Sequence, residues 1–294
     1  MYEYLKQLED NGIVIIQNCI PSEKLRPMQA AFDARLLRLR WNDFDGYEKT
    51  EPYRHMVQDV LTLEQGFVDV ATDPIVCDII HAYVGPEFQL VEAKGWKTLP
   101  IKKDFHGWHG DAWYDQSKTT EIPREVKLAV YLSDVKTGAF NYIKGSHRKE
   151  HPRTYRATEI GVASSNDIVE AVGPAGTGIL FDTSGMHRQG IPVLEPRSAI
   201  FLNYHDPGIP LQQEDIDYYR YHPLLLNAAF LGNLSPQDQR ILGFGDKRNY
   251  RPAFQRADNY NTFQKVSCII HGGSLRERIL RKRVLGKLWR TLGF

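Results

Sequence analysis

The sequence predicts a mainly β protein with flanking helices, an α+β fold built around a jelly-roll core. Between about residues 88 and 205 the chain consists of short runs rich in β-branched and aromatic residues, separated by Gly, Pro, Asn and Asp: FQLVEAKGWKTL, VKLAVYLSD, AFNYIKG, GTGILFD and SAIFLNYH. Apolar residues at helical spacing occur before this region instead. Several short strands at such spacing are typical of a sandwich or barrel, and the jelly roll is the common form whose interior holds a ligand.

The length and composition indicate one elaborated globular domain. The chain has 294 residues, of which 42% are apolar and 25% charged, so a sizeable core is possible and global disorder is excluded. We expect a single domain over residues 1–273. Three scattered cysteines make neither a disulfide framework nor a Cys-based zinc site. Because we find no signal peptide and no apolar run of about 18 residues, we expect a cytoplasmic protein.

The elements before the core follow from local patterns. Residues 2–10 are predicted to be helical, and the β-branched run IVII that follows is predicted to be a buried strand. Ser22 is the predicted N-cap of a helix that continues to about Arg40.

The stretches on either side of the core are less regular. Residues 41–58 are predicted to be a loop, and a second helical stretch spans about residues 63–83 with a break near Asp73-Pro74. Residues 206–273 are predicted to be loops with a few short helices that belong to the same domain.

The stretch GWHGDAWYD contains His109 and Asp111 two residues apart, and a metal site needs a third ligand. The best candidate is His187 in GTGILFDTSGMHRQG, which follows a predicted strand and is therefore expected at the rim of the barrel. Two histidines and one carboxylate on one face, with the other positions open, is the arrangement with which iron(II) binds a co-substrate and oxygen. These three residues are the predicted metal ligands.

Arg197 begins the predicted strand RSAIFLNYH, in which alternation puts Arg197, Asn203 and His205 on a common face. A planar guanidinium binds a carboxylate bidentately, which is what anchoring the distal acid group of 2-oxoglutarate requires. Other interpretations stay open on the residues alone. His-x-Asp pairs are common in surface loops, a histidine after a strand is often a capping or core residue, and Arg197 could pair with Glu195.

Five segments, in the same order, resemble the phytanoyl-CoA dioxygenase family of iron(II)/2-oxoglutarate oxygenases over about residues 8–205. LEDNGIVIIQNCIPSEKL resembles the family's opening strand and helix, WHGD its metal-binding WHxD, and TGAFNYIKGSH its segment ending in Gly-Ser-His. GILFDTSGMH and PRSAIFLNYH complete the pattern, and LGFG at residues 242–245 is similar to a motif near the family's C-terminal end. The resemblance implies a double-stranded β-helix, which is a cupin-like jelly roll.

The resemblance also implies the cofactors and their ligands. Iron(II), 2-oxoglutarate and O2 are expected, with His109, Asp111 and His187 on the iron and Arg197 on 2-oxoglutarate. Hydroxylation, or another oxidation at a C–H bond, is the implied reaction. The alternative from another class is a non-catalytic or redox-neutral metalloprotein of the same fold that binds a metabolite. Formation of succinate discriminates between the two.

Further co-substrate contacts are implied position by position. Thr98 matches a polar position that contacts the co-substrate, and His106 stands where relatives often have an aromatic residue beside it. Two positions depart from the family pattern: Gln189 replaces a hydroxyl residue that contacts the co-substrate, and Lys144 replaces a proline in a turn. Asp111 is present where halogenating relatives have a small residue, so we do not expect a halogenase.

The predicted substrate-lining residues are the aromatic and polar side chains next to the motifs: Lys94, Trp96, Trp113, Tyr114, Phe140, Asn203 and His205. Core packing is the other explanation for the aromatic ones, since aromatic residues dominate cores. A mixed aromatic and polar lining favours a small polar or ring-containing metabolite, such as a natural product, a sugar or a glycolipid.

Residues 274–294 have an unusual composition, with seven Lys or Arg against one Glu in a chain whose net charge is +1. Apolar residues including Trp289 recur at helical spacing opposite the basic ones, which predicts an amphipathic helix. The helix either packs on the barrel or a second subunit, or attaches the protein peripherally to anionic lipid at the inner face of a membrane. One basic end on a near-neutral body argues against nucleic acid as a partner.

Overall fold

The computed structural model describes residues 1–37, 53–104, 106–160, 165–212, 215, 224–232 and 234–244. The chain divides into two compact units, Met1–Asp246 and Lys247–Phe294. The second unit lies outside the described residues and includes the predicted C-terminal helix at residues 274–294. The domain boundary at residue 273 and the role of that helix therefore stay predictions.

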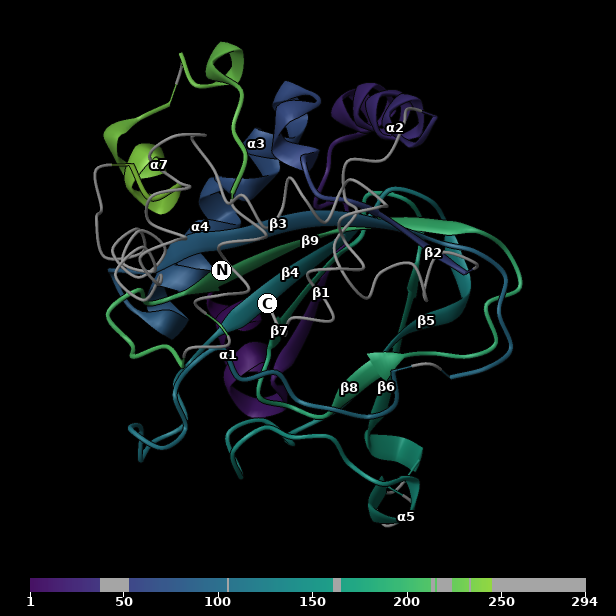
Figure 1. The fold of residues 1–294 in the computed structure, drawn as a ribbon, viewed down its shortest axis with the longest axis vertical. Helices are drawn as coiled ribbons and strands as arrows, with labels where there is room; N and C mark the ends of the chain where they lie inside the picture. The colour runs from purple at the N-terminus through teal and green to yellow at the C-terminus, as the bar shows by residue number, and fades with distance from the viewer. Residues whose placement is uncertain are drawn as a thin grey trace, which may run out of the picture. The chain divides into compact units, whose positions relative to one another are not determined.

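Within the described residues, the strands form two antiparallel sheets (Figure 1). The larger sheet has the order β1-β7-β4-β9-β3-β2 and the smaller one β6-β5-β8. The strands are β1 Ile13–Ile16, β2 Arg54–Val57, β3 Gln89–Thr98, β4 Val126–Tyr131, β5 Val135–Ile143, β6 Ile168–Gly173, β7 Gly178–Asp182, β8 His187–Gln189 and β9 Arg197–His205.

Alternation along the central strands supplies two separate cores. On β4, Leu128 and Val130 belong to a cluster that also contains helix residues, whereas Ala129 and Tyr131 belong to a second cluster with Phe140 of β5. The second cluster joins residues of both sheets and so lies between them. A strand that is buried on both faces is apolar at nearly every position, which explains the continuous run VKLAVYL. The predicted jelly roll is confirmed.

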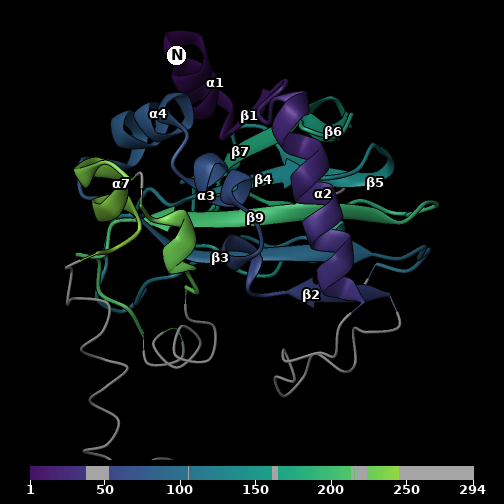
Figure 2. The ribbon, with the colours of Figure 1, turned by 90° about the horizontal axis from the view of Figure 1, so that it is seen from above.

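Helices cover the outer face of the larger sheet (Figure 2). α2, α3 and α4 lie on this face, and Met28, Phe32 and Phe67 from them join one cluster with strand residues. The helices are α1 Tyr2–Asn11, α2 Ser22–Leu36, α3 Gln65–Ala71, α4 Pro74–Val84, α5 Ala157–Ile160 and α7 Pro236–Ile241, with 3₁₀ turns η1 Val60–Thr62, η2 Ser165–Asp167 and η3 Ala228–Phe230. None of the helices among the described residues is long and apolar enough to cross a membrane.

Most of the predicted elements are confirmed, and the break near Asp73-Pro74 separates α3 from α4. The Asp73 side chain accepts a hydrogen bond from the Val76 amide and so caps α4. The prediction that Ser22 is the N-cap of α2 was wrong. The cap position is Pro21, and Ser22 is already helical and makes no side-chain cap hydrogen bond.

Three strands were missed by the sequence analysis. The predicted loop at residues 41–58 was wrong in its last part, because residues 54–57 form β2, the edge strand that pairs with β3. β6 and β8 were also missed, since only Ala171 of β6 is buried and β8 has only three residues. These strands are held by their sheet partners, and such partners leave little mark on a short local pattern.

Gly95 of β3 allows α2 to pack closely on the sheet. A Cβ added at Gly95 would overlap the ring of Phe32. Overpacking a core typically costs about 1–3 kcal/mol, so we expect Gly95→Ala to lower the free energy of unfolding by about that amount. Denaturant titration measures this, with Gly232→Ala as the control because a Cβ there meets nothing within 4 Å. Equal stability of the two variants would contradict the proposed packing.

Candidate active site

Two histidines are brought together by a short stretch of strand-like pairing. The backbone N–H of His109 donates to the carbonyl of His187 (3.0 Å), and the N–H of His187 donates to the carbonyl of His109 (2.8 Å). Asp111 is held by a hydrogen bond from its own amide to the Thr183 carbonyl (2.8 Å). The loop that follows β3 is thereby fixed beside β8, although the two histidines are far apart in the sequence.

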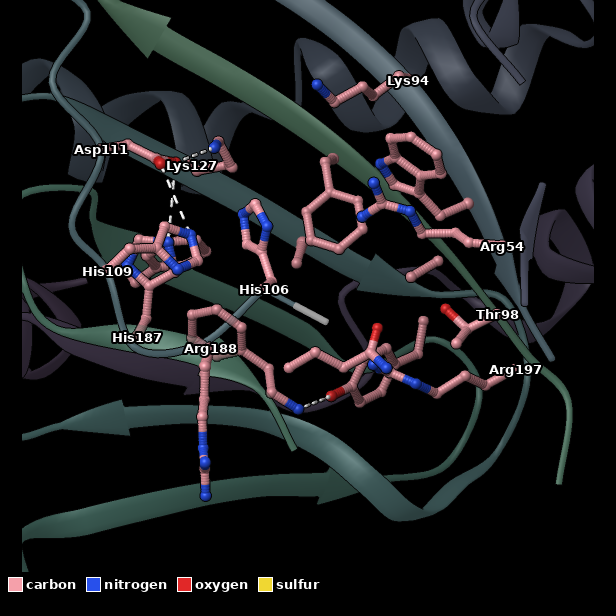
Figure 3. A pocket seen from close by; sticks show the side chains of 18 of the residues that line it. Arg54, Lys94, Thr98, His106, His109, Asp111, Lys127, His187, Arg188 and Arg197 are labelled. Atoms are coloured by element: carbon pink, nitrogen blue, oxygen red, sulfur yellow. Dashed lines mark hydrogen bonds and ion pairs between the residues drawn. The ribbon is translucent and has the colours of Figure 1, made fainter. Parts of the chain in front are cut away.

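The side chains of His109, Asp111 and His187 converge at one point (Figure 3). Asp111 Oδ1 lies 3.7 Å from His109 Nε2, and Asp111 Oδ2 lies 3.7 Å from His187 Nε2. All three ligand atoms lie within 4.8 Å of one another. Atoms that share one ion at about 2.1 Å are at most about 4.2 Å apart, so only small side-chain movements are needed to hold a metal ion.

Backbone carbonyls orient both imidazole rings. His109 Nδ1 lies 3.0 Å from the Gly107 carbonyl and His187 Nδ1 lies 2.8 Å from the Gly185 carbonyl. A carbonyl can only accept, so Nδ1 carries the proton in each ring and the lone pair is on Nε2, which faces Asp111. Hydrogen bonding of the distant nitrogen is the usual way to fix the tautomer of a metal-binding histidine.

A buried carboxylate shapes the turn that precedes His187. Asp182, the last residue of β7, accepts hydrogen bonds from the amide and hydroxyl of Ser184 and from the hydroxyl of Tyr83 (2.7 Å). The hydroxyl of Tyr142 donates to the Asp182 carbonyl (3.0 Å). This network closes the turn between β7 and β8 and sets the direction in which His187 enters the site.

The electrostatics of the site favour the metal-binding forms of His109 and Asp111. Burial, followed by the charge of His187, lowers the pKa of His109 to about 3. Burial alone would raise the pKa of Asp111, but the charge of Lys127, whose Nζ lies 2.7 Å from Asp111 Oδ2, helps to hold it well below its ordinary value. An ionised carboxylate and a neutral imidazole at neutral pH are the ligand forms that a divalent ion requires.

The three residues form one wall of a cavity of about 320 Å³. Figure 3 shows Thr98 and Arg197 together across the cavity from the triad. The described lining residues are mainly aromatic and cationic: Arg54, Lys94, Trp96, Thr98, His106, His109, Asp111, Trp113, Lys127, Ala129, Tyr131, Phe140, Phe181, His187, Arg188, Gln189, Arg197, Ala199 and Phe201. A cavity of this size accommodates small molecules rather than macromolecular segments.

Arg197 is a buried cation with no acidic partner among the described residues. It is 8% exposed, its Nε is buried without a hydrogen-bond partner, and burial lowers its pKa. The amide Nε2 of Gln189, which also lines the cavity, is a second buried donor without a partner among the described residues. Because an uncompensated buried charge is strongly destabilising, this end of the cavity is suited to an anionic ligand.

Some of the predicted substrate residues line the cavity and others do not. Lys94, Trp96, Trp113 and Phe140 line the cavity, as does His106, whose ring centroid lies 4.1 Å from that of His109. The cavity lining does not include Tyr114, Asn203 or His205. The hydroxyl of Tyr114 is hydrogen-bonded to His151 Nδ1 (2.8 Å) in a neighbouring loop.

Asn203 and His205 are buried on β9 beyond the end of the cavity. Phe201 is the last residue of β9 in the cavity lining, and Asn203 and His205 follow it along the strand. His205 Nδ1 lies 3.5 Å from Glu125 Oε1. Burial lowers the pKa of His205 to about 4 and raises the pKa of Glu125 to about 8, so both groups are neutral near pH 7.

The raised pKa of Glu125 predicts a pH-dependent stability. The folded state keeps the Glu125 proton up to about pH 8, while the unfolded chain loses it near the ordinary value of 4.5. The contribution of Glu125 to the free energy of unfolding is therefore fully present below pH 4.5 and is lost as the pH rises to about 8. We expect Glu125→Gln to lose less stability than the wild type between pH 5 and about pH 8. Thermal melts across that window measure the difference, and parallel curves would contradict it.

Sequence reasoning missed several cavity residues, among them Arg54, Lys127, Tyr131 and Arg188. Two of them could have been found, because alternation from Ala129 in the run VKLAVYL puts Lys127 and Tyr131 on the same face. Arg188 follows His187 directly. Arg54 carried no such signal, since its strand was not recognised.

The donor set fits an iron centre with an organic acid beside it. Two imidazole nitrogens and one carboxylate, on one side of an open cavity, is the facial arrangement of non-haem iron(II) oxygenases. The same cavity contains the Arg197 guanidinium, whose Nε has no hydrogen-bond partner among the described residues, and a guanidinium is a group that can bind a carboxylate. Together with the jelly-roll core, these features define the class of iron(II)/2-oxoglutarate oxygenases.

Comparison with known proteins gives the family. The family model "Phytanoyl-CoA dioxygenase (PhyH)" matches residues 8–190, and the chain belongs to this family. The protein is an iron(II)- and 2-oxoglutarate-dependent dioxygenase that uses O2.

Two curated relatives are ectoine dioxygenases. The one from Nocardia farcinica (strain IFM 10152) is 25% identical over 243 residues, covering 69% of this chain and 77% of the relative. The one from Stutzerimonas stutzeri (strain A1501) is 24% identical over 235 residues, covering 69% and 76%.

Solved structures share the fold. HygX from Streptomyces hygroscopicus with nickel and 2-oxoglutarate has a TM-score of 0.54 at 15% identity, over 72% of this chain and 89% of HygX. EctD from S. alaskensis with 2-oxoglutarate and 5-hydroxyectoine has a TM-score of 0.54 at 19% identity, over 72% and 78%.

Proposed function

We propose that His109, Asp111 and His187 bind the iron of this dioxygenase and that Arg197 binds the distal carboxylate of 2-oxoglutarate. One observation carries the proposal: the three converging ligand atoms and the unpartnered buried guanidinium line the same cavity. With O2, the bound iron and 2-oxoglutarate would supply the oxidation of a substrate C–H bond together with conversion of 2-oxoglutarate to succinate and CO2.

The residues of the chain position these groups. Arg197 lies across the cavity from the triad, with Thr98 beside it, so a short dicarboxylate held by the metal at one end would have the guanidinium to bind its other end (Figure 3). The Gln189 amide, a buried donor facing the same cavity, takes the place of the hydroxyl found in relatives. The ring of His106 packs edge-on against His109 and limits the side from which the site is open.

We propose a small polar or ring-containing metabolite as the substrate. The cavity of about 320 Å³ has aromatic walls at Trp96, Trp113 and Phe140 and polar groups between them. In the solved relatives, HygX was captured with hygromycin B and EctD with 5-hydroxyectoine, both small molecules. Hydroxylation is the expected outcome at the C–H bond that lies nearest the metal.

Anaerobic titration with 2-oxoglutarate tests the co-substrate site directly. Protein loaded with iron(II) is expected to bind 2-oxoglutarate and to develop a visible absorption band when the keto acid chelates the metal. Gln189→Ala is expected to weaken binding by about 2–10-fold, since one neutral hydrogen bond contributes about 0.5–1.5 kcal/mol. Saturation without any visible band would contradict chelation at the triad.

Lys127 is expected to determine which carboxylate oxygen of Asp111 binds the metal. Its Nζ holds Asp111 Oδ2 at 2.7 Å and its side chain is only 10% exposed, so one carboxylate oxygen is occupied while the other is left for the metal. Groups that orient a metal ligand typically matter 10–100-fold, so we expect Lys127→Met to reduce 2-oxoglutarate turnover by about 10–100-fold. Lys97→Met is the control, because Lys97 does not line the cavity. Equal rates in the two variants would contradict this role.

A further inference from the structure

Both proposed histidine ligands end the same local pattern, Asp-x-x-Gly-x-His. The two copies are DFHGWH at residues 104–109 and DTSGMH at residues 182–187. In each copy the glycine carbonyl contacts Nδ1 of the histidine, at 3.0 Å in the first copy and 2.8 Å in the second. The aspartate that begins each copy can therefore influence where that carbonyl points, and with it the orientation of the imidazole ring.

In the second copy, the aspartate closes the turn from the inside of the protein. Asp182 Oδ1 accepts hydrogen bonds from the backbone N–H (2.8 Å) and the hydroxyl (2.6 Å) of Ser184. Its other oxygen accepts from the hydroxyl of Tyr83 (2.7 Å), and Asp182 is fully buried. This copy shows how a carboxylate can fix the backbone that orients a histidine ligand.

In the first copy, Asp104 makes the equivalent backbone contacts. Asp104 Oδ1 accepts hydrogen bonds from the N–H groups of His106 (3.1 Å) and Gly107 (2.8 Å), as aspartate commonly does in turns. Gly107 has a φ of 69°, in the left-handed region that glycine adopts without steric cost. Because Asp104 binds the N–H of Gly107 while the carbonyl of Gly107 contacts His109, a single residue connects the carboxylate to the imidazole.

Arg188 is to Asp104 what Tyr83 is to Asp182, a partner for the second carboxylate oxygen. Arg188 Nη1 donates to Asp104 Oδ2 (3.2 Å), and the guanidinium carbon lies 4.7 Å from the centroid of the Trp108 ring. Arg188 comes directly after one proposed ligand, and Trp108 directly before the other. We call Asp104, Trp108 and Arg188 the Asp104 clasp. It joins the two histidine-bearing segments through side chains.

The Asp104 clasp is more exposed than the Asp182 network. The side chains of Arg188 and Asp104 are 27% and 24% exposed. Figure 3 shows the Arg188 side chain extending away from the triad. An ion pair that water reaches is weaker than a buried network, and Asp104 belongs to none of the hydrophobic core clusters among the described residues. A change at Asp104 should therefore alter the orientation of His109 without unfolding the core.

We propose that Asp104 is a positioning residue for the metal centre. Its carboxylate, held by Arg188, fixes the Gly107 carbonyl, and that carbonyl keeps the proton of His109 on Nδ1 and the lone pair of Nε2 directed at the metal. This inference rests on the proposed function, because only there is His109 a metal ligand. Asp104 acts through His109 rather than by contact with the metal.

The tautomer of His109 in the metal-free full chain provides the first test. Long-range proton–nitrogen NMR spectra distinguish a proton on Nδ1 from one on Nε2, and His109→Gln identifies the signals of His109. We expect the Nδ1–H form in the wild type and a mixture of both forms in Asp104→Ala. Asp69→Ala is the control: Asp69 also has two side-chain partners, Lys24 (2.6 Å) and Gln65 (3.0 Å), but does not line the cavity. It should leave the His109 signals unchanged.

The affinity for nickel(II), measured by calorimetry, provides the second test. Partners of metal ligands typically matter 10–100-fold, and Asp104 acts through Gly107, so we expect Asp104→Ala to weaken binding by about tenfold. Asp104→Asn keeps an oxygen that accepts the backbone hydrogen bonds and should recover most of the affinity. Asp69→Ala should bind like the wild type.

The contribution of Arg188 is separated by combining the variants. We expect Arg188→Met to weaken nickel(II) binding by up to about fivefold, the effect of a partly exposed ion pair. In the Asp104→Ala background the same change should have a smaller effect, because both residues act through one carboxylate. Equal effects in the two backgrounds would contradict the Asp104 clasp.

Further outcomes decide between the inference and the proposed function. The inference is overturned if Asp104→Ala is folded, keeps the single Nδ1–H form of His109 and binds nickel(II) as well as Asp69→Ala. If Asp104→Ala does not fold, Arg188→Met decides, and an unchanged tautomer with unchanged affinity there overturns it. Absence of nickel(II) binding in the wild type contradicts the proposed metal site instead. The His109 signals of the metal-free protein still show in that case whether Asp104 orients the ring.

Discussion

Replacing His187 by alanine is expected to abolish metal binding and 2-oxoglutarate turnover together. His187 supplies one of three ligand atoms, its side chain is 5% exposed, and its Nδ1 is committed to the Gly185 carbonyl, which leaves Nε2 facing Asp111. Changes to residues that only orient a ligand weaken metal sites 10–100-fold, so loss of the ligand itself should weaken binding by more than about 100-fold. Calorimetric titration with nickel(II) measures the affinity, and succinate formation measures the turnover.

A histidine outside the site separates this effect from a general loss of stability. His81 is an exposed residue at the end of α4, and His81→Ala should retain wild-type metal affinity. The folded content of both variants is checked by circular dichroism. If His187→Ala is folded and binds nickel(II) within about threefold of the wild type, a spread too small for a lost ligand, the triad is not the metal site.

Replacing Arg197 by methionine is expected to raise the KM for 2-oxoglutarate strongly. The buried guanidinium would face the distal carboxylate where little water can compensate, and truncating one partner of such a pair costs about 2–5 kcal/mol. We therefore expect an increase in KM on the order of 100-fold. Metal affinity should change little, because Arg197 lies across the cavity from the ligands (Figure 3).

Two comparisons sharpen the interpretation of Arg197. Arg197→Lys keeps the charge but loses the planar fork, so it should restore only part of the affinity. Methionine also removes a buried charge that has no acidic partner among the described residues, so Arg197→Met is expected to be at least as stable as the wild type in the absence of 2-oxoglutarate. An unchanged KM in a stable Arg197→Met protein would contradict a role in co-substrate binding.

The sequence predicted correctly those features that depend on residues close together in the chain. Strands buried on both faces, such as β4 and β9, stand out as apolar runs bounded by turn residues, and the spacing of such runs predicted the jelly roll. His109 and Asp111 are two residues apart, so their proximity was expected. That His187 meets them depends on the reciprocal hydrogen bonds between the backbones of His109 and His187. The position of His187 after a predicted strand had made it the candidate third ligand, and the family resemblance implied the same residue.

Whether the remaining residues line the cavity depends on where along each strand the cavity ends and on which strands pair. Alternation correctly puts Asn203 and His205 on the same face as Arg197, but a pattern of period two does not say where along the strand a cavity ends. Arg54 depends on the pairing of β2 with β3, and its neighbours Arg54–Val57 form no apolar run. Lys127 looked like an interruption in an apolar strand, and only its 2.7 Å contact with Asp111 reveals why a buried lysine is tolerated there.

The most direct test of the account is aerobic conversion of 2-oxoglutarate to succinate with added iron(II), comparing the wild type with His109→Ala and Arg197→Ala. The account predicts that the wild type forms succinate slowly even without its substrate, and that His109→Ala forms none. Arg197→Ala should recover activity only at much higher 2-oxoglutarate concentration. Succinate formation that is equal in all three proteins would contradict the site, because the chemistry would then not depend on the metal ligand or on the co-substrate anchor.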